Sequence, residues 1–159
     1  MPDDKEIERK FWKALRSDMT VMLGAKGVDP RPMTAQMEEA DHGPLWFFTS
    51  RQSELVKALP GNSEAYFSFT DKGHNVWAAV KGRLMLTRDR ATIDRLWNPF
   101  VAAWFEQGKD DPDLALLRFD PATAEIWLDG SSILAGLRIL MGSDPKEDYK
   151  DKVAKVSLV

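Results

Sequence analysis

Apolar residues recur at helical spacing at the start of the chain. Within residues 4–16, Ile7, Phe11 and Leu15 lie four residues apart, and Trp12 lies beside them. A helix places such positions on one side. We therefore expect a helix here that packs against the rest of the protein.

From Met19 the pattern changes to short segments rich in β-branched and aromatic residues, each bounded by Gly, Pro, Asp or Asn. These segments predict strands at residues 19–26, 33–40, 45–49 and 64–70. Strict alternation over residues 76–86 predicts a long central strand with one covered face. Gly82 within it predicts a bulge or bend, which helps a sheet to curl into a barrel.

The other segments follow the same signals of periodicity and punctuation. Residues 53–59 predict a short helix with Ser53 as its N-cap. Residues 89–107 predict helical structure that breaks near Asn98-Pro99. After these, residues 114–119 and 125–128 predict two strands around an Asp120-Pro121 turn. Residues 131–141 predict a helix, residues 144–152 a surface loop and residues 153–159 a last strand.

The order of these elements limits the fold class. It lacks the regular βαβ alternation of a doubly wound sheet, and no G-x-G-x-x-G follows any strand. We expect one domain over residues 1–159, mainly β within the α+β class: a β-barrel with flanking helices. Its ends are the helix at 4–16 and the loop and strand at 144–159.

The aromatic content of the chain favours a protein that binds a ligand or a partner. The 159 residues include six Trp and eight Phe, and large aromatic residues concentrate in cores, interfaces and planar-ligand sites. The net charge of -3 offers no field for a phosphate backbone, so we expect no nucleic-acid partner. No apolar run approaches the roughly 20 residues of a membrane span.

The absence of cysteine also excludes classes of chemistry. Disulfides, thiolate catalysis and cysteine-based metal sites are impossible, and two histidines are too few for a metal cluster. The charged N-terminus lacks the apolar run of a signal peptide. We therefore expect a cytoplasmic protein without a metal or a membrane anchor.

The stretch from residue 31 to residue 53 carries groups that bind anions. Arg31 can hold a phosphate with two hydrogen bonds, and Ser50 and Ser53 can donate hydroxyl protons. The N–H groups of the helix that Ser53 caps suit the same ligand. A plain alternative makes Arg31 a surface residue and Ser53 a helix cap only.

Several short motifs, in this order and spacing, resemble a known family. They are Arg31-x-Met33, LWFFTS at 45–50, Ser53 in the next helix cap, AYFSF at 65–69, the strand at 80–84, KDDP at 109–112, Leu116-Leu117 and AEIW at 124–127. Over nearly the whole chain they are similar to the flavin-binding split barrels related to pyridoxamine phosphate oxidase, in particular the short bacterial general stress proteins. None of the motifs is specific alone.

This resemblance implies a split β-barrel that binds flavin mononucleotide (FMN) as a homodimer, with the flavin sites at the subunit interface. FAD or a deazaflavin remains open as the cofactor. The implied binding residues are Arg31, Met33, Thr34, Gln36, Phe48, Thr49, Ser50, Ser53 and Trp77, with Trp127 near a flavin bound mainly by the other subunit. Trp77 and Trp127 serve equally well as dimer-interface anchors.

The chain departs from the family pattern at three positions. Gln36 stands where relatives often have a lysine, and Glu54 and Leu55 stand where relatives commonly provide a basic residue. The phosphate site is therefore weaker in positive charge, which puts the cofactor affinity in question.

Three functions fit this reading. The chain is a flavin-dependent oxidoreductase acting on an unknown small molecule, a flavin-binding or flavin-buffering stress protein without turnover, or a dimeric interaction module with a decayed cofactor site. In an oxidoreductase, Trp104 and Phe105 would line the cavity if their segment folds over the flavin. No catalytic residue is identified, and the cofactor would supply the hydride chemistry.

Overall fold

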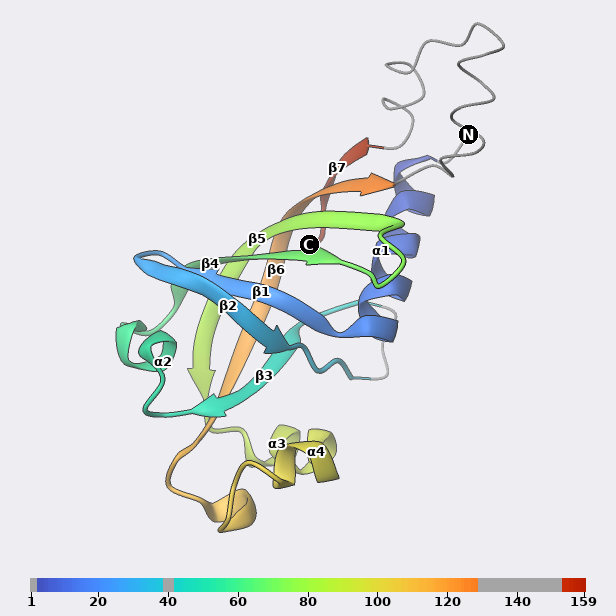
Figure 1. Ribbon diagram of the computed structural model, residues 1–159. Coiled ribbons are helices and arrows are strands. Elements are labelled where there is room, and N and C mark those ends of the chain that lie inside the picture. Colours follow the sequence, from blue (N-terminus) through green and yellow to red (C-terminus); the bar gives the residue numbers. More distant parts are fainter. Residues whose placement is uncertain (1–2, 39–41, 129–152) are drawn as a thin grey trace, which may run out of the picture.

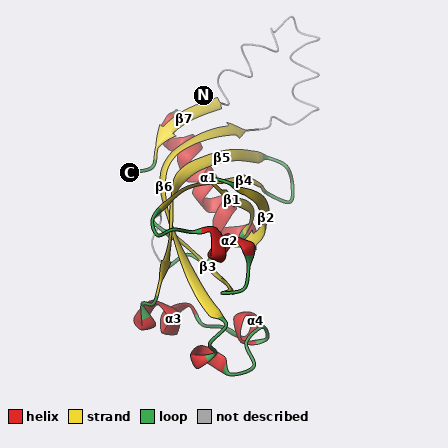
Figure 2. Ribbon diagram, turned by 90° about the vertical axis from the view of Figure 1, so that its left-hand side faces the viewer, coloured by secondary structure: helices red, strands yellow, loops and turns green. Residues whose placement is uncertain are grey.

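The computed structural model describes residues 3–38, 42–128 and 153–159. The first element, α1 (Asp4–Asp18), buries Ile7, Phe11 and Leu15, as the four-residue spacing predicted. Asp3 caps its start by accepting a hydrogen bond from the Glu6 N–H. The helix packs against the strands β5 (Val76–Thr87), β6 (Leu114–Leu128) and β7 (Val153–Ser157) (Figure 1 and Figure 2).

Within the described residues, seven antiparallel strands form the body of the molecule. They are β1 (Thr20–Ala25), β2 (Val28–Thr34), β3 (Leu45–Ser50), β4 (Ser63–Thr70), β5 (Val76–Thr87), β6 (Leu114–Leu128) and β7 (Val153–Ser157). Six follow the spatial order β2-β1-β4-β5-β6-β3, and β7 pairs with β6. The curled sheet with a few flanking helices confirms the expected α+β barrel.

A single bridge joins the two edges of this sheet. Just beyond β2, the Gln36 N–H donates to the Trp46 oxygen of β3 at 2.7 Å, and the Trp46 N–H donates back at 2.8 Å. The first and last strands of the six-strand order therefore meet. Pairing of this kind satisfies backbone groups that an open edge would expose.

The other helices of the described residues are short. They are α2 (Glu54–Ala58), α3 (Arg90–Leu96), α4 (Pro99–Ala102) and the 3₁₀ turn η1 (Gly108–Asp110). Ser53 caps α2 and Asn98 caps α4, so the predicted cap and the predicted break at Asn98-Pro99 are both confirmed. In the described part of the chain, no helix has the length and apolar character needed to span a bilayer.

Two apolar clusters of described residues hold these elements together. The main core lies between α1 and the inner face of the sheet, and its fully buried side chains include Phe11, Phe47, Phe67 and Phe119. A second cluster lies under α3 and α4. Its members are Trp46, Ile93, Leu96, Val101, Phe105, Leu114 and Leu116, with Phe48 and Trp97 packed against them.

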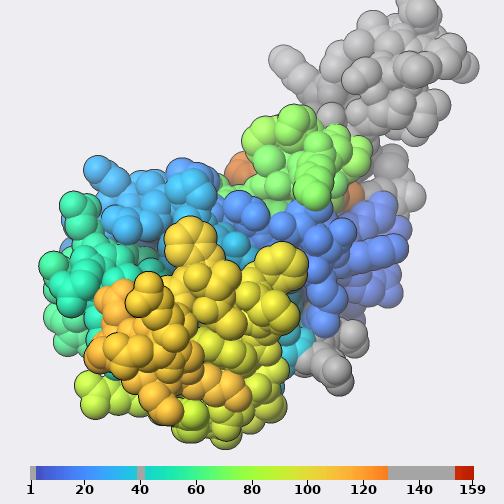
Figure 3. All heavy atoms as spheres, turned by 60° about the horizontal axis from the view of Figure 1, so that its bottom comes forward, coloured from blue at the N-terminus to red at the C-terminus, as the bar shows by residue number. Residues whose placement is uncertain are grey.

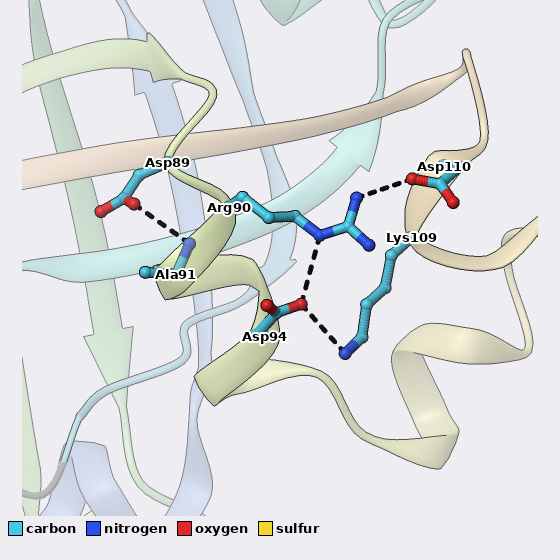
Figure 4. A network of polar contacts seen from close by, with 6 residues as sticks. All are labelled: Asp89, Arg90, Ala91, Asp94, Lys109 and Asp110. Carbon is cyan, nitrogen blue, oxygen red and sulfur yellow. Dashed lines mark hydrogen bonds and ion pairs between the residues drawn. The ribbon is translucent and has the colours of Figure 1, made fainter.

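An ion-pair network ties α3 to η1 (Figure 4). The Asp94 carboxylate lies 3.2 Å from Arg90 Nε and 3.0 Å from Lys109 Nζ. Arg90 Nη1 also lies 2.7 Å from the Asp110 carboxylate. Thus α3 and η1, which are separated by α4 and a short connection in the sequence, are fixed next to each other at one end of the barrel.

The strand predicted at residues 33–40 is misplaced, because the structure has a strand at Val28–Thr34 instead. Gly27, at a φ of +81°, turns the chain directly from β1 into β2. Pro30 and Pro32 lie within this strand, although proline is generally disfavoured in strands. They are tolerated because β2 lies at an edge of the sheet, where a missing N–H breaks no ladder.

The two strands predicted around Asp120-Pro121 are a single strand, β6. Pro121 lies opposite Gly82, where the register between β5 and β6 shifts after Lys81. A proline fits at such a bulge because the ladder hydrogen bond is already interrupted there. The predicted bulge at Gly82 is confirmed, and it is what lets the proline stay within the strand.

For most of the other described elements, the observed ends lie within one to three residues of the predicted ends. This holds for the strands predicted at 45–49, 64–70, 76–86 and 153–159. The helix predicted at 131–141 and the loop predicted at 144–152 lie outside the described residues.

Candidate functional site

Three elements meet where the anion-binding residues were predicted. Arg31 projects from β2, Ser50 ends β3, and Ser53 caps α2. Arg31 Nη2 lies 3.6 Å from the Glu54 carboxylate, and the Ser53 N–H donates to the Ser50 carbonyl oxygen at 3.1 Å. We call Arg31, Ser50 and Ser53 the anion corner.

Arg31 is the only cation among these three residues, and its side chain is 34% exposed. Its contact with Glu54 is at the surface, where an ion pair contributes little and an incoming anion can replace it. The Ser53 oxygen accepts from the Val56 N–H at 3.3 Å, which leaves the hydroxyl proton of Ser53 able to point outward. Arg31 and Ser53 therefore can serve one anionic group together.

Ser50 is differently engaged. Its hydroxyl donates to the Asp113 carboxylate at 2.7 Å and accepts from the Gln52 N–H at 3.0 Å. The Asp113 contact pins the end of β3 to the start of β6, which gives Ser50 a structural task. Asp113 is 63 positions away in sequence, so no local pattern pointed to this pair.

The predicted tryptophans lie together elsewhere on the barrel. Trp77 of β5 faces Trp127 of β6 in direct register, and Trp77 is 46% exposed. Both line a hollow of about 800 Å³ on the sheet, which we call the sheet hollow. Its other walls come from the ends of β1, β4, β5 and β6: Thr20, Val21, Met22, Ser68, Phe69, Thr70, Ala78, Ala79 and Leu128.

None of the described residues that line the sheet hollow has an ionisable side chain. Its groups are aromatic rings, aliphatic chains and a few hydroxyls, so it suits a flat, uncharged surface. At the β4–β5 turn, the His74 ring lies 5.6 Å from the Trp77 ring, at an interplanar angle of 31°. His74 is exposed, and its ring supports one face of Trp77.

The residues of β2 are divided between the two faces of the strand. Arg31 and Met33 lie opposite the buried Leu23 and Val21, and Met33 packs against the main core. Thr34 lies opposite Thr20, which borders the sheet hollow. Because directly opposed residues share a face, Thr34 belongs with the hollow and Arg31 does not.

Gln36, Thr49 and Phe48 have other surroundings. Gln36 forms the backbone bridge to Trp46, with its side chain half-buried. Thr49, also half-buried, lies opposite Ala115 of β6. Phe48 packs edge to face against Trp97, with ring centroids 6.0 Å apart, in the second cluster. Phe105 is buried in the same cluster, whereas Trp104 is exposed.

One chain thus presents two separate groups of predicted residues. The anion corner gathers Arg31, Ser50 and Ser53 beside α2, and the sheet hollow gathers Trp77 and Trp127 with Thr34 at its border. In Figure 1, α2 lies at the opposite side of the barrel from the start of β5 and the end of β6.

Comparisons with known proteins agree with this architecture. A family model described as pyridoxamine 5'-phosphate oxidase like matches residues 6–149. A general stress family protein from Xanthomonas campestris pv. campestris is 54% identical, with a TM-score of 0.77, and the match covers 83% of this chain and 93% of that one. The general stress FMN/FAD binding protein from Xanthomonas citri is 52% identical, with a TM-score of 0.76 and coverage of 80% and 92%.

A more distant relative is Protein bli-3 of Neurospora crassa, which is 26% identical over 98 residues. That match covers 57% of this chain, and the chain spans about half the length of this relative, 47%. The family match covers most of the chain and the similar structures share its split barrel. This chain therefore belongs to the pyridoxamine 5'-phosphate oxidase-like family.

Proposed function

We propose that this chain is a general stress-type protein that binds FMN as a homodimer. The observation that carries the proposal is the pair of complementary groups on one barrel: a cationic corner for a phosphate and an uncharged, tryptophan-lined hollow for a ring. The Xanthomonas citri relative, 52% identical, is named as an FMN/FAD binding protein. The family assignment and this name support a flavin over other ligands that combine a phosphate with a ring system.

The residues fit the two ends of FMN. Arg31 and Ser53 would hold the phosphate, with Glu54 displaced from Arg31 by the incoming anion. Trp77 and Trp127 would contact the ring system, whose broad apolar face matches the uncharged hollow. The single arginine and the adjacent Glu54 predict modest affinity for the phosphate end.

Arg31 of the anion corner and Thr34 at the border of the hollow lie on different faces of β2, and this separation favours a site shared between two chains. The anion corner of one chain would face the hollow of a second copy, so that each dimer carries two flavins. FMN is proposed over FAD because Arg31 is the one cation of the corner's three residues, enough for one phosphate. When bound, the flavin would supply hydride or single-electron transfer.

The walls of the hollow favour binding over proton-coupled turnover. The described lining residues include no acid or base that could deliver a proton to a substrate. An oxidoreductase that transfers only a hydride remains compatible with these walls. Oxidation of NADH or NADPH by the purified FMN-loaded protein separates the two functions, and the absence of turnover would favour a binding or buffering role.

The first test is the visible spectrum of the purified protein, with a thermal melt with and without added FMN. Specific binding to the native state raises the melting temperature and leaves flavin absorbance with the protein after gel filtration. FAD, a deazaflavin and riboflavin are compared at equal concentrations. A colourless protein whose melting temperature does not respond to any of them would overturn the proposal.

Substitution of Arg31 tests the phosphate role. Arg31→Gln removes a charged hydrogen-bonding partner, and we expect the dissociation constant for FMN to rise about 10–100-fold. Riboflavin lacks the phosphate, so its affinity should hardly change. The matched control is Arg88→Gln at another exposed arginine. Equal losses for FMN and riboflavin would mean that Arg31 acts on the fold and not on the phosphate.

A further inference from the structure

Two aromatic side chains at the end of the barrel are almost fully exposed. Phe100, on α4, is 84% exposed, and Trp104, four residues later, is 83% exposed. Exposed large aromatic side chains that lie near each other on one segment are typical of a protein–protein contact surface. We call Phe100 and Trp104 the aromatic knob.

The knob stands on a rigid base. The Asn98 side chain accepts hydrogen bonds from the Phe100 and Val101 N–H groups at 2.9 and 3.0 Å. Val101 and Phe105, on the inner side of the same segment, are buried in the second cluster. The ion pairs of Figure 4 fix the neighbouring α3 and η1. Exposure of the two rings is therefore built into the folded chain, and little backbone entropy remains to be lost on docking.

The knob and the sheet hollow lie at opposite ends of the molecule. Figure 1 shows α4 at the bottom, far from the start of β5 and the end of β6. Figure 3 views the bottom of the molecule, where the segment that carries α3 and α4, yellow in the figure, is foremost. Two chains placed side by side in opposite directions would bring each knob to the hollow of the other chain.

We propose that the aromatic knob of one chain docks in the sheet hollow of a second copy. The described walls of this hollow of about 800 Å³ are mainly aromatic and aliphatic, with a few hydroxyls and no charged side chain, which suits the two rings. A two-fold dimer makes this contact twice with the same surfaces. Four such rings with their matching surface would bury about 1,200–2,000 Å², which is the area of a specific protein interface.

This contact would complete the site described above. Because Trp77 and Trp127 line the hollow, Phe100 and Trp104 of the second copy would form a wall opposite them. The inference extends the proposed dimer to particular residues. It does not need the flavin, so its test is made on the flavin-free protein.

The first experiment measures the oligomeric state of the full chain by sedimentation velocity over a concentration series. We expect a dimer, and we expect the Phe100→Ala/Trp104→Ala variant to raise the dimer dissociation constant at least about 100-fold. The matched control is Glu106→Ala/Gln107→Ala, which changes two exposed side chains of the same segment. A monomeric wild-type chain, or a knob variant as dimeric as wild type, would overturn the inference.

A change in the hollow provides a second, independent arm. Ala79→Arg places a charge among the apolar walls and should also dissociate the dimer, whereas Gln52→Arg, at an exposed site beside α2, should not. Circular dichroism and a thermal melt of each variant establish that it is folded. A folded Ala79→Arg variant that stays dimeric would exclude the hollow as the docking surface.

Cross-linking identifies which surfaces meet. The sequence has no cysteine, so Ala79→Cys in the hollow and Ala103→Cys beside the knob provide two unique thiols at exposed alanines. We expect a short bismaleimide to join the two chains when both variants are mixed, and not when either is treated alone. Cross-linking of Ala79→Cys with itself would show that two hollows face each other, and it would overturn the inference.

Discussion

Gly82 determines how the two longest strands fit together. A Cβ at this position would overlap the Asp120 backbone oxygen and lie 2.9 Å from the Phe119 ring. Its φ is not in the left-handed region, so glycine is needed here for space and not for its backbone freedom. The close approach brings the bulge and Pro121 together inside one continuous strand.

We predict that Gly82→Ala destabilises the protein by about 1–3 kcal/mol, because the backbone of β6 must move to admit a methyl group. Urea unfolding followed by fluorescence measures the change. The control is Lys81→Ala, at the exposed neighbouring position, with an expected change within about 0.5 kcal/mol. Equal stability of Gly82→Ala and wild type would mean that β6 moves to admit the methyl group with no loss in the free energy of unfolding.

The segment that contains α3, α4 and η1 is a small unit with its own apolar cluster and its own ion pairs. The hydrogen bond from Lys109 lowers the pKa of Asp94 below its usual value of 3.8, and Arg90 acts in the same direction. The Thr92 hydroxyl likewise lowers the pKa of Asp89, the N-cap of α3. These carboxylates are therefore best able to hold the unit together when they are ionised.

The sign of the pH dependence follows from the lowered pKa. Ionised Asp94 contributes to stability above pH 3.8, and the contribution is lost as the pH falls through the lower pKa of the folded state. We predict that Asp94→Asn flattens the decline of the melting temperature in this acid range. The difference from wild type should shrink at high salt, because these exposed charges are screened. An acid decline as steep in the variant as in wild type would exclude this network as its cause.

For the whole molecule, the proposed flavin site and the proposed knob contact involve the same two chains. A ligand that bridges two subunits binds the dimer more tightly than the monomer, so it must also strengthen the dimer. The coupling is reciprocal, and it does not depend on which contact forms first.

We predict that saturating FMN lowers the dimer dissociation constant, measured by sedimentation velocity in a dilution series with and without FMN. Arg31→Gln should reduce this shift, since it weakens the phosphate end of the site, while leaving the flavin-free dimer unchanged. FMN that binds without any change in the dimer equilibrium would place the whole flavin site within one chain.

Local signals predicted much of the fold. The amphipathic α1, the alternation of β4 and β5, the caps at Ser53 and Asn98 and the bulge at Gly82 were all readable. Each depends on residues within a few positions of one another, where backbone geometry and side-chain periodicity act directly.

The sequence also predicted the chemistry of the candidate site but not its arrangement. Arg31 and Ser53 were identified by residue type, and Trp77 and Trp127 by resemblance. Their division into two separate groups depends on which face of β2 each side chain takes and on the pairing of β5 with β6. Neither follows from local spacing.

Tertiary structure alone decided the remaining features. Pro30 and Pro32 lie in a strand because β2 is at an edge, and Pro121 lies within β6 because it faces a bulge. Ser50 is held by Asp113 from far along the chain, and Phe100 is exposed although its residue type favours burial. The physical reason is common to all four. A residue's own chemistry fixes its local preference, whereas the segments folded against it determine whether its hydrogen bonds are satisfied and its apolar surface is covered.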